Sequence, residues 1–184
     1  MTLPASRGQL RASFVRWALV LVPTMVALGL LSAQLSGSGA DDPWFEALAK
    51  PALYPPPATF AIVWTVLYVL MGFALTLIVT ARGAHGRKSA IVAFVVQLVL
   101  NLAWSPVFFG AHQLASALWL LLAIDLAAAG TIWLFAQVRP QAAWLLAPYL
   151  AWLAFATVLT WQFQQLNPQA EADAGSGAAV RYQL

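Results

Sequence analysis

Three apolar stretches of this chain carry aromatic and amide side chains at intervals of three or four residues. Residues at that spacing share one face of a helix, so each stretch would present a single lining face. A flat apolar molecule could stack on such rings while an amide supplies one polar contact. The three series are Phe60, Trp64, Tyr68 and Met71; Gln97, Asn101, Trp104 and Phe108; and Tyr149, Trp152, Phe155 or Ala156, and Leu159. The pattern favours three faces that converge on one interior cavity.

A purely structural interpretation of the same residues stays open. Gln97 and Asn101 would lose their water partners in lipid, at a cost of roughly a few kcal/mol without a hydrogen bond, so they should face protein, water or a ligand. Hydrogen bonds between helices, each worth roughly 0.6–2 kcal/mol, would also satisfy them. Likewise, Trp64, Trp104 and Trp152 could be packed core residues.

Conventional catalytic or metal chemistry has little support. Asp125 is the only carboxylate inside an apolar stretch, which makes it a functional candidate by default. It could equally be protonated, lie at a subunit contact or bond to a backbone group. The chain has no cysteine, and His85 and His112 fall in different loops, so no metal site is predicted. The catalytic residues remain unassigned.

The elements that must position these residues are five long helices. Only 8% of the 184 residues are charged and 62% are hydrophobic, which a soluble domain of this size could not cover with a polar surface. Crossing a bilayer takes about 20 helical residues, and the runs that qualify are 14–35, 60–81, 89–109, 114–138 and 142–163. The runs lack the alternation of a β-barrel. The sequence predicts an all-α membrane protein, a bundle of five transmembrane helices.

The basic residues predict the orientation of this bundle. One side would carry Arg7, Arg11, Arg16, Arg82, Arg87, Lys88 and Arg139, and the other only Lys50 and Arg181. The positive-inside rule then places the N-terminus in the cytoplasm and the C-terminus outside. We expect a basic cytoplasmic segment (1–13), a transmembrane domain (14–166) and a disordered tail (167–184). Few basic residues, all beside the membrane, argue against a nucleic-acid partner.

The long connection between the first two helices, residues 36–59, is predicted to be structured and to act as a lid. Pro43 after Asp42 is a good helix start, because proline tolerates the first turn and aspartate caps free amides. The candidate lid residues are Trp44, Leu53 and Tyr54. Within the later helices, Pro106 and Pro148 predict a bend or local rearrangement.

These motifs, in this order, resemble the tryptophan-rich sensory protein/translocator protein family, also called the peripheral benzodiazepine receptor family. The matching segments are Lys50-Pro51, Pro55-Pro56, Val63 to Tyr68, Met71-Gly72, Gln97, Leu100-Asn101, Trp104, Phe108 to Ala111 and Pro148 to Thr157. The resemblance covers roughly residues 23–163. It indicates a bacterial member, in either bacterial membrane.

The resemblance implies a five-helix bundle, usually dimeric, whose cavity lies under the first loop and binds porphyrins, haem, sterols or synthetic ligands. Trp64 and Trp152 match the family's pocket tryptophans, Asn101 its third-span amide, and Tyr149, Phe155 and Ala156 the last-span wall. The expected ligand-binding residues are Trp64, Tyr68, Asn101, Trp104, Phe108, Tyr149, Trp152, Phe155 and Ala156. The chain departs from the family pattern at Leu53, where tryptophan is usual, at Thr160, where Leu-Asn is usual, and at Trp161 with Gln165, which replace the residues of the animal sterol motif.

The resulting hypothesis is a membrane protein that binds porphyrin, haem or another flat apolar ligand, in tetrapyrrole handling or stress-linked sensing. One alternative is an enzyme that degrades porphyrin with light and oxygen. Another is a transporter or scaffold for sterol-like or lipid-like cargo. No cofactor is required; protoporphyrin IX or haem would be a ligand. The expected partners are that ligand, membrane lipid and a second copy of the chain.

Overall fold

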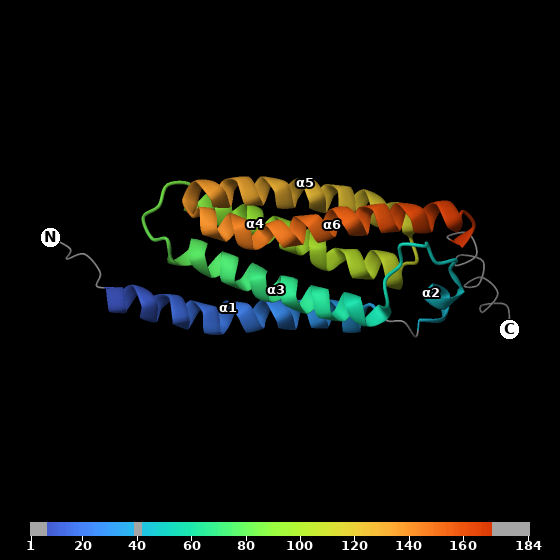
Figure 1. Cartoon of the computed structure of the whole chain (residues 1–184), viewed down its shortest axis with the longest axis horizontal. Helices are drawn as coiled ribbons and strands as arrows, with labels where there is room; N and C mark the ends of the chain where they lie inside the picture. The colour runs from blue at the N-terminus through green and yellow to red at the C-terminus, as the bar shows by residue number, and fades with distance from the viewer. Residues whose placement is uncertain (1–6, 39–41, 171–184) are drawn as a thin grey trace.

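The computed structural model describes residues 7–38 and 42–170, apart from the side chain of Arg7. Five long helices dominate it (Figure 1). The elements are α1 (Arg7–Leu35), α2 (Pro43–Ala47), α3 (Pro57–Thr80), α4 (Arg87–Ser105), a π-helical turn η1 (Pro106–Gly110), α5 (Leu114–Val138) and α6 (Pro140–Leu166). The described residues contain no strand. The predicted all-α class and its five membrane-spanning helices are confirmed.

Several helices extend beyond their apolar stretches. Helix α3 begins at Pro57 rather than residue 60, because proline fits the first turn of a helix, where its missing N–H costs nothing. Helix α1 begins at Arg7 rather than residue 14, since polar residues can continue a helix outside lipid. Helix α5 has the predicted bounds. Of the tail expected to be disordered, residues 167–170 are described, and residues 171–184 lie outside the described part.

The long helices form a closed bundle in which α1 packs on α3, α3 on α6, α6 on α5 and α5 on α4. They run side by side (Figure 1). We call one end the basic end; it holds the start of α1 and the α3–α4 and α5–α6 connections. The other, the loop end, holds residues 36–38 and 42–56, the α4–α5 connection and the end of α6. This order places the inner faces of α3, α4 and α6 around a common interior.

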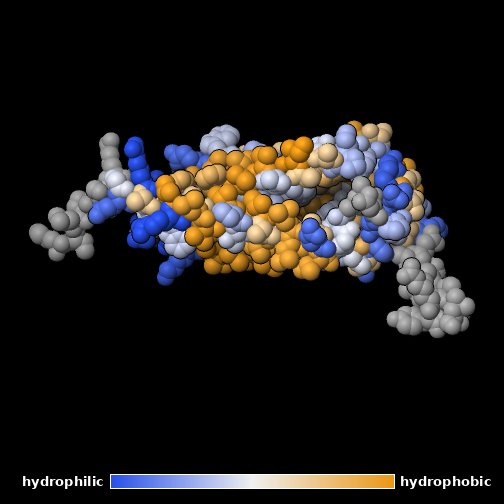
Figure 2. Space-filling view, turned by 90° about the horizontal axis from the view of Figure 1, so that it is seen from below, coloured by the Kyte–Doolittle hydropathy of each residue, from blue (hydrophilic) through white to orange (hydrophobic). Residues whose placement is uncertain are grey.

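On the face seen in Figure 2, an apolar belt lies between two polar ends of the bundle. Each of the five long helices is long and apolar enough to cross a membrane, so the chain is a multi-pass membrane protein. Exposed tryptophans lie toward both ends, as expected where indoles meet lipid headgroups. They are Trp17, Trp133 and Trp144 toward the basic end and Trp119 and Trp161 toward the loop end. Trp44 instead packs against His112.

Two glycines let α1 and α3 approach closely. A Cβ atom on Gly72 would lie 2.7 Å from the Cα atom of Val22, and one on Gly29 would overlap the ring of Tyr68. Small residues at such contacts are typical of helix packing in membranes. Gly29 therefore makes the space that the Tyr68 ring occupies.

Candidate ligand-binding site

Two hydrogen-bonded pairs of polar side chains lie in the middle of the bundle. The Tyr68 hydroxyl donates to the Asn101 side-chain oxygen at 2.9 Å, joining α3 to α4. The Tyr149 hydroxyl donates to the Gln97 side-chain oxygen at 2.8 Å, joining α6 to α4. All four side chains are buried. We call these four residues the polar tier. The amides of Gln97 and Asn101 accept hydrogen bonds from other helices, in agreement with the purely structural interpretation of the sequence.

Trp64 lies against the polar tier. Its ring centroid is 5.6 Å from that of Tyr68 and 6.4 Å from that of Tyr149, within the range of direct aromatic contact. Trp152 lies nearer the loop end, 5.8 Å from Phe60 and 5.1 Å from Phe155. Both tryptophans are half-buried. The rings from α3 and α6 thus meet inside the bundle and touch one another directly.

Three buried donors in this region have no hydrogen-bond partner among the described residues. They are the side-chain nitrogen of Gln97 and the indole nitrogens of Trp104 and Trp152. Buried donors are nearly always satisfied, so each such group calls for a water or a ligand acceptor. An apolar molecule with a few acceptor atoms would satisfy them. Gln97 was placed on an inner face by its spacing but was missing from the expected site residues.

Residues 42–56, which we call the loop segment, cover this interior with a cluster of rings. Phe45 contacts Tyr54, Phe108, Phe109 and Phe163 at centroid distances of 5.4–6.1 Å. This cluster joins α2 and the loop to η1 and α6. It forms a second buried core at the loop end.

The three candidate lid residues have different positions. Trp44 stacks on His112 at 4.4 Å and meets the edge of Phe108 at 5.7 Å. Tyr54 packs against Phe60 and Phe163. Leu53 is 53% exposed. The structure therefore brings Trp44 and Tyr54 onto the bundle and leaves Leu53 at the surface.

Polar contacts hold the loop segment in place. The Asn167 side chain accepts from the Ala49 amide at 2.8 Å and donates to the Ala49 carbonyl at 3.1 Å. The Lys50 ammonium donates to the carbonyls of Phe45 and Leu48 at the end of α2. Asp42 caps the start of α2 through the Phe45 amide, as predicted. Asn167 was missed by sequence reasoning, because only the fold places it beside residue 49.

The proline in the third span rearranges the backbone as expected. From Pro106 to Gly110 the helix widens into a π turn, in which the Ala111 amide donates to the Pro106 carbonyl at 2.8 Å. This turn directs Phe108 inward, where it stacks on Trp104 at 4.9 Å. Such turns are frequent at functional sites. Trp104 and Phe108 thereby belong to the inner aromatic surface.

A shallow groove of about 450 Å³ follows the outer side of α3 and α6. Its walls are Ile62, Val63, Val66, Leu67, Leu70, Pro148, Ala151 and Trp152. Several of these residues are exposed in the apolar belt. Trp152 lines the groove and also contacts the rings of Phe60 and Phe155, so it separates the lipid-facing side from the interior.

Asp125 joins two helices. Thr157 on α6 donates to one Asp125 carboxylate oxygen at 2.8 Å, and the other oxygen is buried without a described partner. Ala156, the neighbour of that threonine, packs against the main core. Among the described residues, no three histidine, cysteine or acidic side chains lie together as a metal would require. The site has the chemistry of ring stacking and a few directed hydrogen bonds.

The expected site residues all lie on inner faces or their margins. Tyr68, Asn101, Phe108 and Tyr149 are buried, and Trp64, Trp104, Trp152, Phe155 and Ala156 are half-buried. Their rings already contact one another. A ligand placed between Trp64 and Trp152 would therefore have to part these contacts, because both indoles pack on neighbouring rings.

Comparison with known proteins gives a consistent result. The model of the TspO/MBR family matches residues 19–166. The human translocator protein is 43% identical over 120 residues, covering 64% of this chain and 71% of its own length. The tryptophan-rich sensory protein of Cereibacter sphaeroides is 35% identical over 159 residues, covering 85% and 98%. The tryptophan-rich protein TspO of Chlorobaculum tepidum is 36% identical over 126 residues, covering 68% and 80%.

Proposed function

Because the chain belongs to the TspO/MBR family, we propose that it binds a flat apolar ligand of the porphyrin or haem type inside its bundle. The ligand would stack between Trp64 and Trp152 beneath the loop segment. This binding would serve stress-linked sensing or tetrapyrrole handling; a relative from Cereibacter sphaeroides is named a tryptophan-rich sensory protein. In this proposal the porphyrin or haem is a ligand and not a required cofactor.

One observation carries this proposal: half-buried indoles adjoin buried donors that lack an acceptor. The indole nitrogen of Trp152 and the side-chain nitrogen of Gln97 both lack a described partner. A packed core without a ligand role would normally pair such donors. An aromatic ligand with acceptor atoms would use the rings and the donors together.

The geometry also suggests how a ligand would enter. Trp152 is a wall of the α3–α6 groove and also contacts Phe60 and Phe155. Rotation of this indole would connect the groove with the interior. An apolar ligand dissolved in the bilayer would reach the groove laterally, while the tethered loop segment keeps water out from the loop end.

The test is titration of the purified full chain with protoporphyrin IX, followed by porphyrin absorbance and calorimetry. The double variant Trp64→Ala/Trp152→Ala should bind at least about tenfold more weakly, because each aromatic stacking contact is worth roughly 0.5–1.5 kcal/mol beyond its buried area. The matched control is Trp119→Ala/Trp133→Ala, which removes two exposed tryptophans from α5. Equal affinity of the site variant and the control would refute the site.

An enzymatic role is the second candidate. Trp64 contacts both Tyr68 and Tyr149, and such neighbouring redox-active rings could take part in radical chemistry beside an illuminated porphyrin. Illumination of the complex should then give one defined product over many cycles, and Trp64→Phe should abolish it. Bleaching at the same rate in the Trp64→Phe variant would exclude this role.

We also propose that the N-terminus is cytoplasmic and the C-terminus outside. The support is the bias of basic residues toward one end, which the positive-inside rule assigns to the cytoplasm. A reporter that is active only outside the cytoplasm should work at the C-terminus and fail at the N-terminus. The reverse result would invert the orientation.

A homodimer is the further proposal that follows from the family resemblance. The exposed residues Val92, Val96 and Val99 form a branched apolar ridge along α4, to which a second copy could pack. Cysteines introduced singly along this ridge should crosslink in membranes. Failure at all three positions would remove α4 from the interface.

A further inference from the structure

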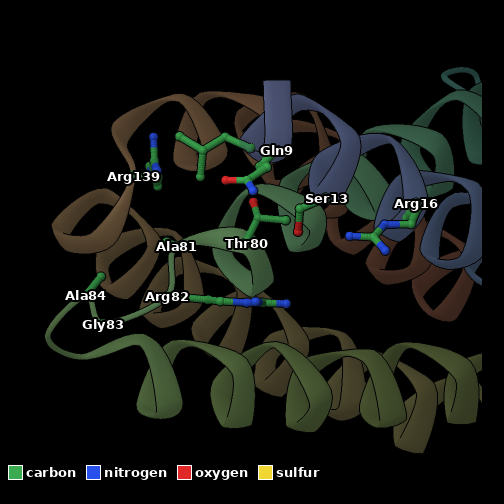
Figure 3. Close-up of a pocket in the computed structure, with 10 residues that line it drawn as sticks. Gln9, Ser13, Arg16, Thr80, Ala81, Arg82, Gly83, Ala84 and Arg139 are labelled. Atoms are coloured by element: carbon green, nitrogen blue, oxygen red, sulfur yellow. The ribbon is translucent and has the colours of Figure 1, made fainter. Parts of the chain in front are cut away.

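The basic end contains a pocket of about 780 Å³, at the opposite end of the bundle from the loop segment. The first turns of α1 form one wall, and the end of α3 with the α3–α4 connection forms the other. Its lining residues are Gln9, Leu10, Ser13, Arg16, Thr80, Ala81, Arg82, Gly83, Ala84 and Arg139 (Figure 3). The polar tier and the tryptophan site do not contribute to it, so its role is independent of the proposed function.

Three guanidinium groups give the pocket its charge. Arg16 and Arg82 extend from opposite walls toward the same space, and Arg139 stands at the far end (Figure 3). The six carboxylates of the sequence belong to other segments: Asp41, Asp42, Glu46, Asp125, Glu171 and Asp173. Within the described part of the chain, none of them pairs with these arginines. The pocket therefore presents uncompensated positive charge.

A neighbouring arginine outside the pocket, Arg87, binds the end of α3. Arg87 donates to the carbonyls of Ile78 and Val79, at distances of 2.8–3.2 Å, and so caps the end of α3. The negative end of that helix dipole is thereby covered. Among the described residues, the Arg16 and Arg82 side chains have no hydrogen bond or ion pair, so both can bind an anion from outside the chain.

The walls are also apolar, which restricts the kind of anion. Leu10 is 55% exposed, and the half-buried Ala84 contributes further apolar surface. Val20 lies two turns beyond Ser13 on the same face of α1 and is 57% exposed within the apolar belt. A lipid whose phosphate sits between the arginines could lay its acyl chains along this face. A soluble anion would use the charge and leave the apolar wall unused.

We propose that this pocket binds the headgroup of an anionic phospholipid, with Arg16 and Arg82 holding the phosphate oxygens and Arg139 at the rim. Arginine forms paired hydrogen bonds to phosphate oxygens, and basic pockets between membrane helices suit such headgroups. The volume lies within the range of pockets that hold small molecules. The bound lipid would tie α1, which packs mainly on α3, to the α3–α4 connection.

The test compares the melting temperature of the full chain in nanodiscs of phosphatidylcholine with that in nanodiscs containing phosphatidylglycerol. Phosphatidylglycerol should stabilise the wild type, and native mass spectrometry should show it retained. In the Arg16→Gln/Arg82→Gln variant its apparent affinity should fall by at least about tenfold, because charged hydrogen bonds to phosphate are lost. The matched control, Arg11→Gln/Lys88→Gln, removes two exposed charges from the same end outside the pocket and should retain binding.

Equal loss in the pocket variant and the control would overturn the proposal, since net charge alone would then explain binding. Equal stabilisation by phosphatidylcholine would overturn it as well. If inorganic phosphate alone reproduced the shift, the pocket would be a soluble-anion site and the lipid assignment would be wrong. Should the double variant fail to fold, the single variants Arg16→Gln and Arg82→Gln must each weaken binding, and unchanged binding in both would refute the site.

Discussion

The Tyr149 hydroxyl donates a 2.8 Å hydrogen bond to the side-chain oxygen of Gln97 and joins α6 to α4 through the centre of the bundle. Both side chains are almost completely buried, and both helices also pack on α5. Because lipid offers no replacement partner, this bond fixes how the inner faces of two helices are rotated toward each other. The same rotation of α6 brings Trp152 to the interior, and it places Tyr149 against Trp64 of α3.

Removing this hydroxyl should destabilise the bundle. Tyr149→Phe leaves the Gln97 amide wholly unpaired, so the free energy of unfolding should fall by about 1–3 kcal/mol. Adding Gln97→Leu should recover most of that loss, since an apolar pair leaves no buried polar group unsatisfied. Denaturant unfolding in detergent measures both, with Tyr54→Phe at the loop end as the control. Strictly additive losses would show that the two residues are not coupled.

A larger side chain at position 29 should disturb the polar tier, although Gly29 is not one of its four residues. A methyl group there would overlap the Tyr68 ring, so Gly29→Ala must displace that ring and weaken its bond to Asn101. The expected loss is about 1–3 kcal/mol, as for other overpacked positions. Gly130→Ala is the control, because open space surrounds Gly130 and alanine favours the helix by about 0.5–1 kcal/mol. Stability measurements that gave both variants the same sign would contradict the close approach.

Loss of the Asn167 side chain should free the loop segment. Asn167→Ala removes both hydrogen bonds to the Ala49 backbone, so the Ala49 amide and its neighbours should exchange with solvent faster. Hydrogen–deuterium exchange by mass spectrometry would localise the change to residues 42–54. The exposed Gln165→Ala substitution on the same helix serves as the control. Unchanged exchange in Asn167→Ala would mean that the aromatic cluster alone holds the segment.

The loop contacts should also weaken at high pH. Burial raises the pKa of Tyr54 above its ordinary value of 10.0, so the folded chain holds this proton more tightly than the unfolded chain. The contribution of Tyr54 to the stability of the folded chain is complete below pH 10 and is lost as the pH rises above that value. Protease accessibility of the loop should increase there in the wild type. Tyr54→Phe should remove the part of this increase that depends on Tyr54. A pH profile identical to that of the wild type would show that other groups cause the increase.

Local features could be predicted because they depend only on nearby residues. Helix α5 begins at Leu114 and ends at Val138 as its apolar run predicted, and Asp42 caps α2 as expected. The inner faces of α3, α4 and α6 also followed from spacing, since a buried amide such as Asn101 has only one tolerable side of its helix.

Partners across the bundle could not be predicted, because they depend on which helices become neighbours. Nothing local pairs Tyr68 with Asn101 rather than Gln97, and nothing places Asn167 beside Ala49, from which it is separated by most of the chain. Leu53 was expected in the lid and stands exposed, since the loop path decides which side chains reach the bundle.

By itself, the sequence determined that the chain crosses the membrane with five helices and which faces of α3, α4 and α6 avoid lipid, because the transfer of side chains between water and lipid acts residue by residue. Only the tertiary structure decided the pairs of the polar tier, the contact of Gly29 with Tyr68 and the placement of Arg16 and Arg82 around one pocket at the basic end. Those depend on the order and rotation of whole helices, which are set by packing summed over many distant residues.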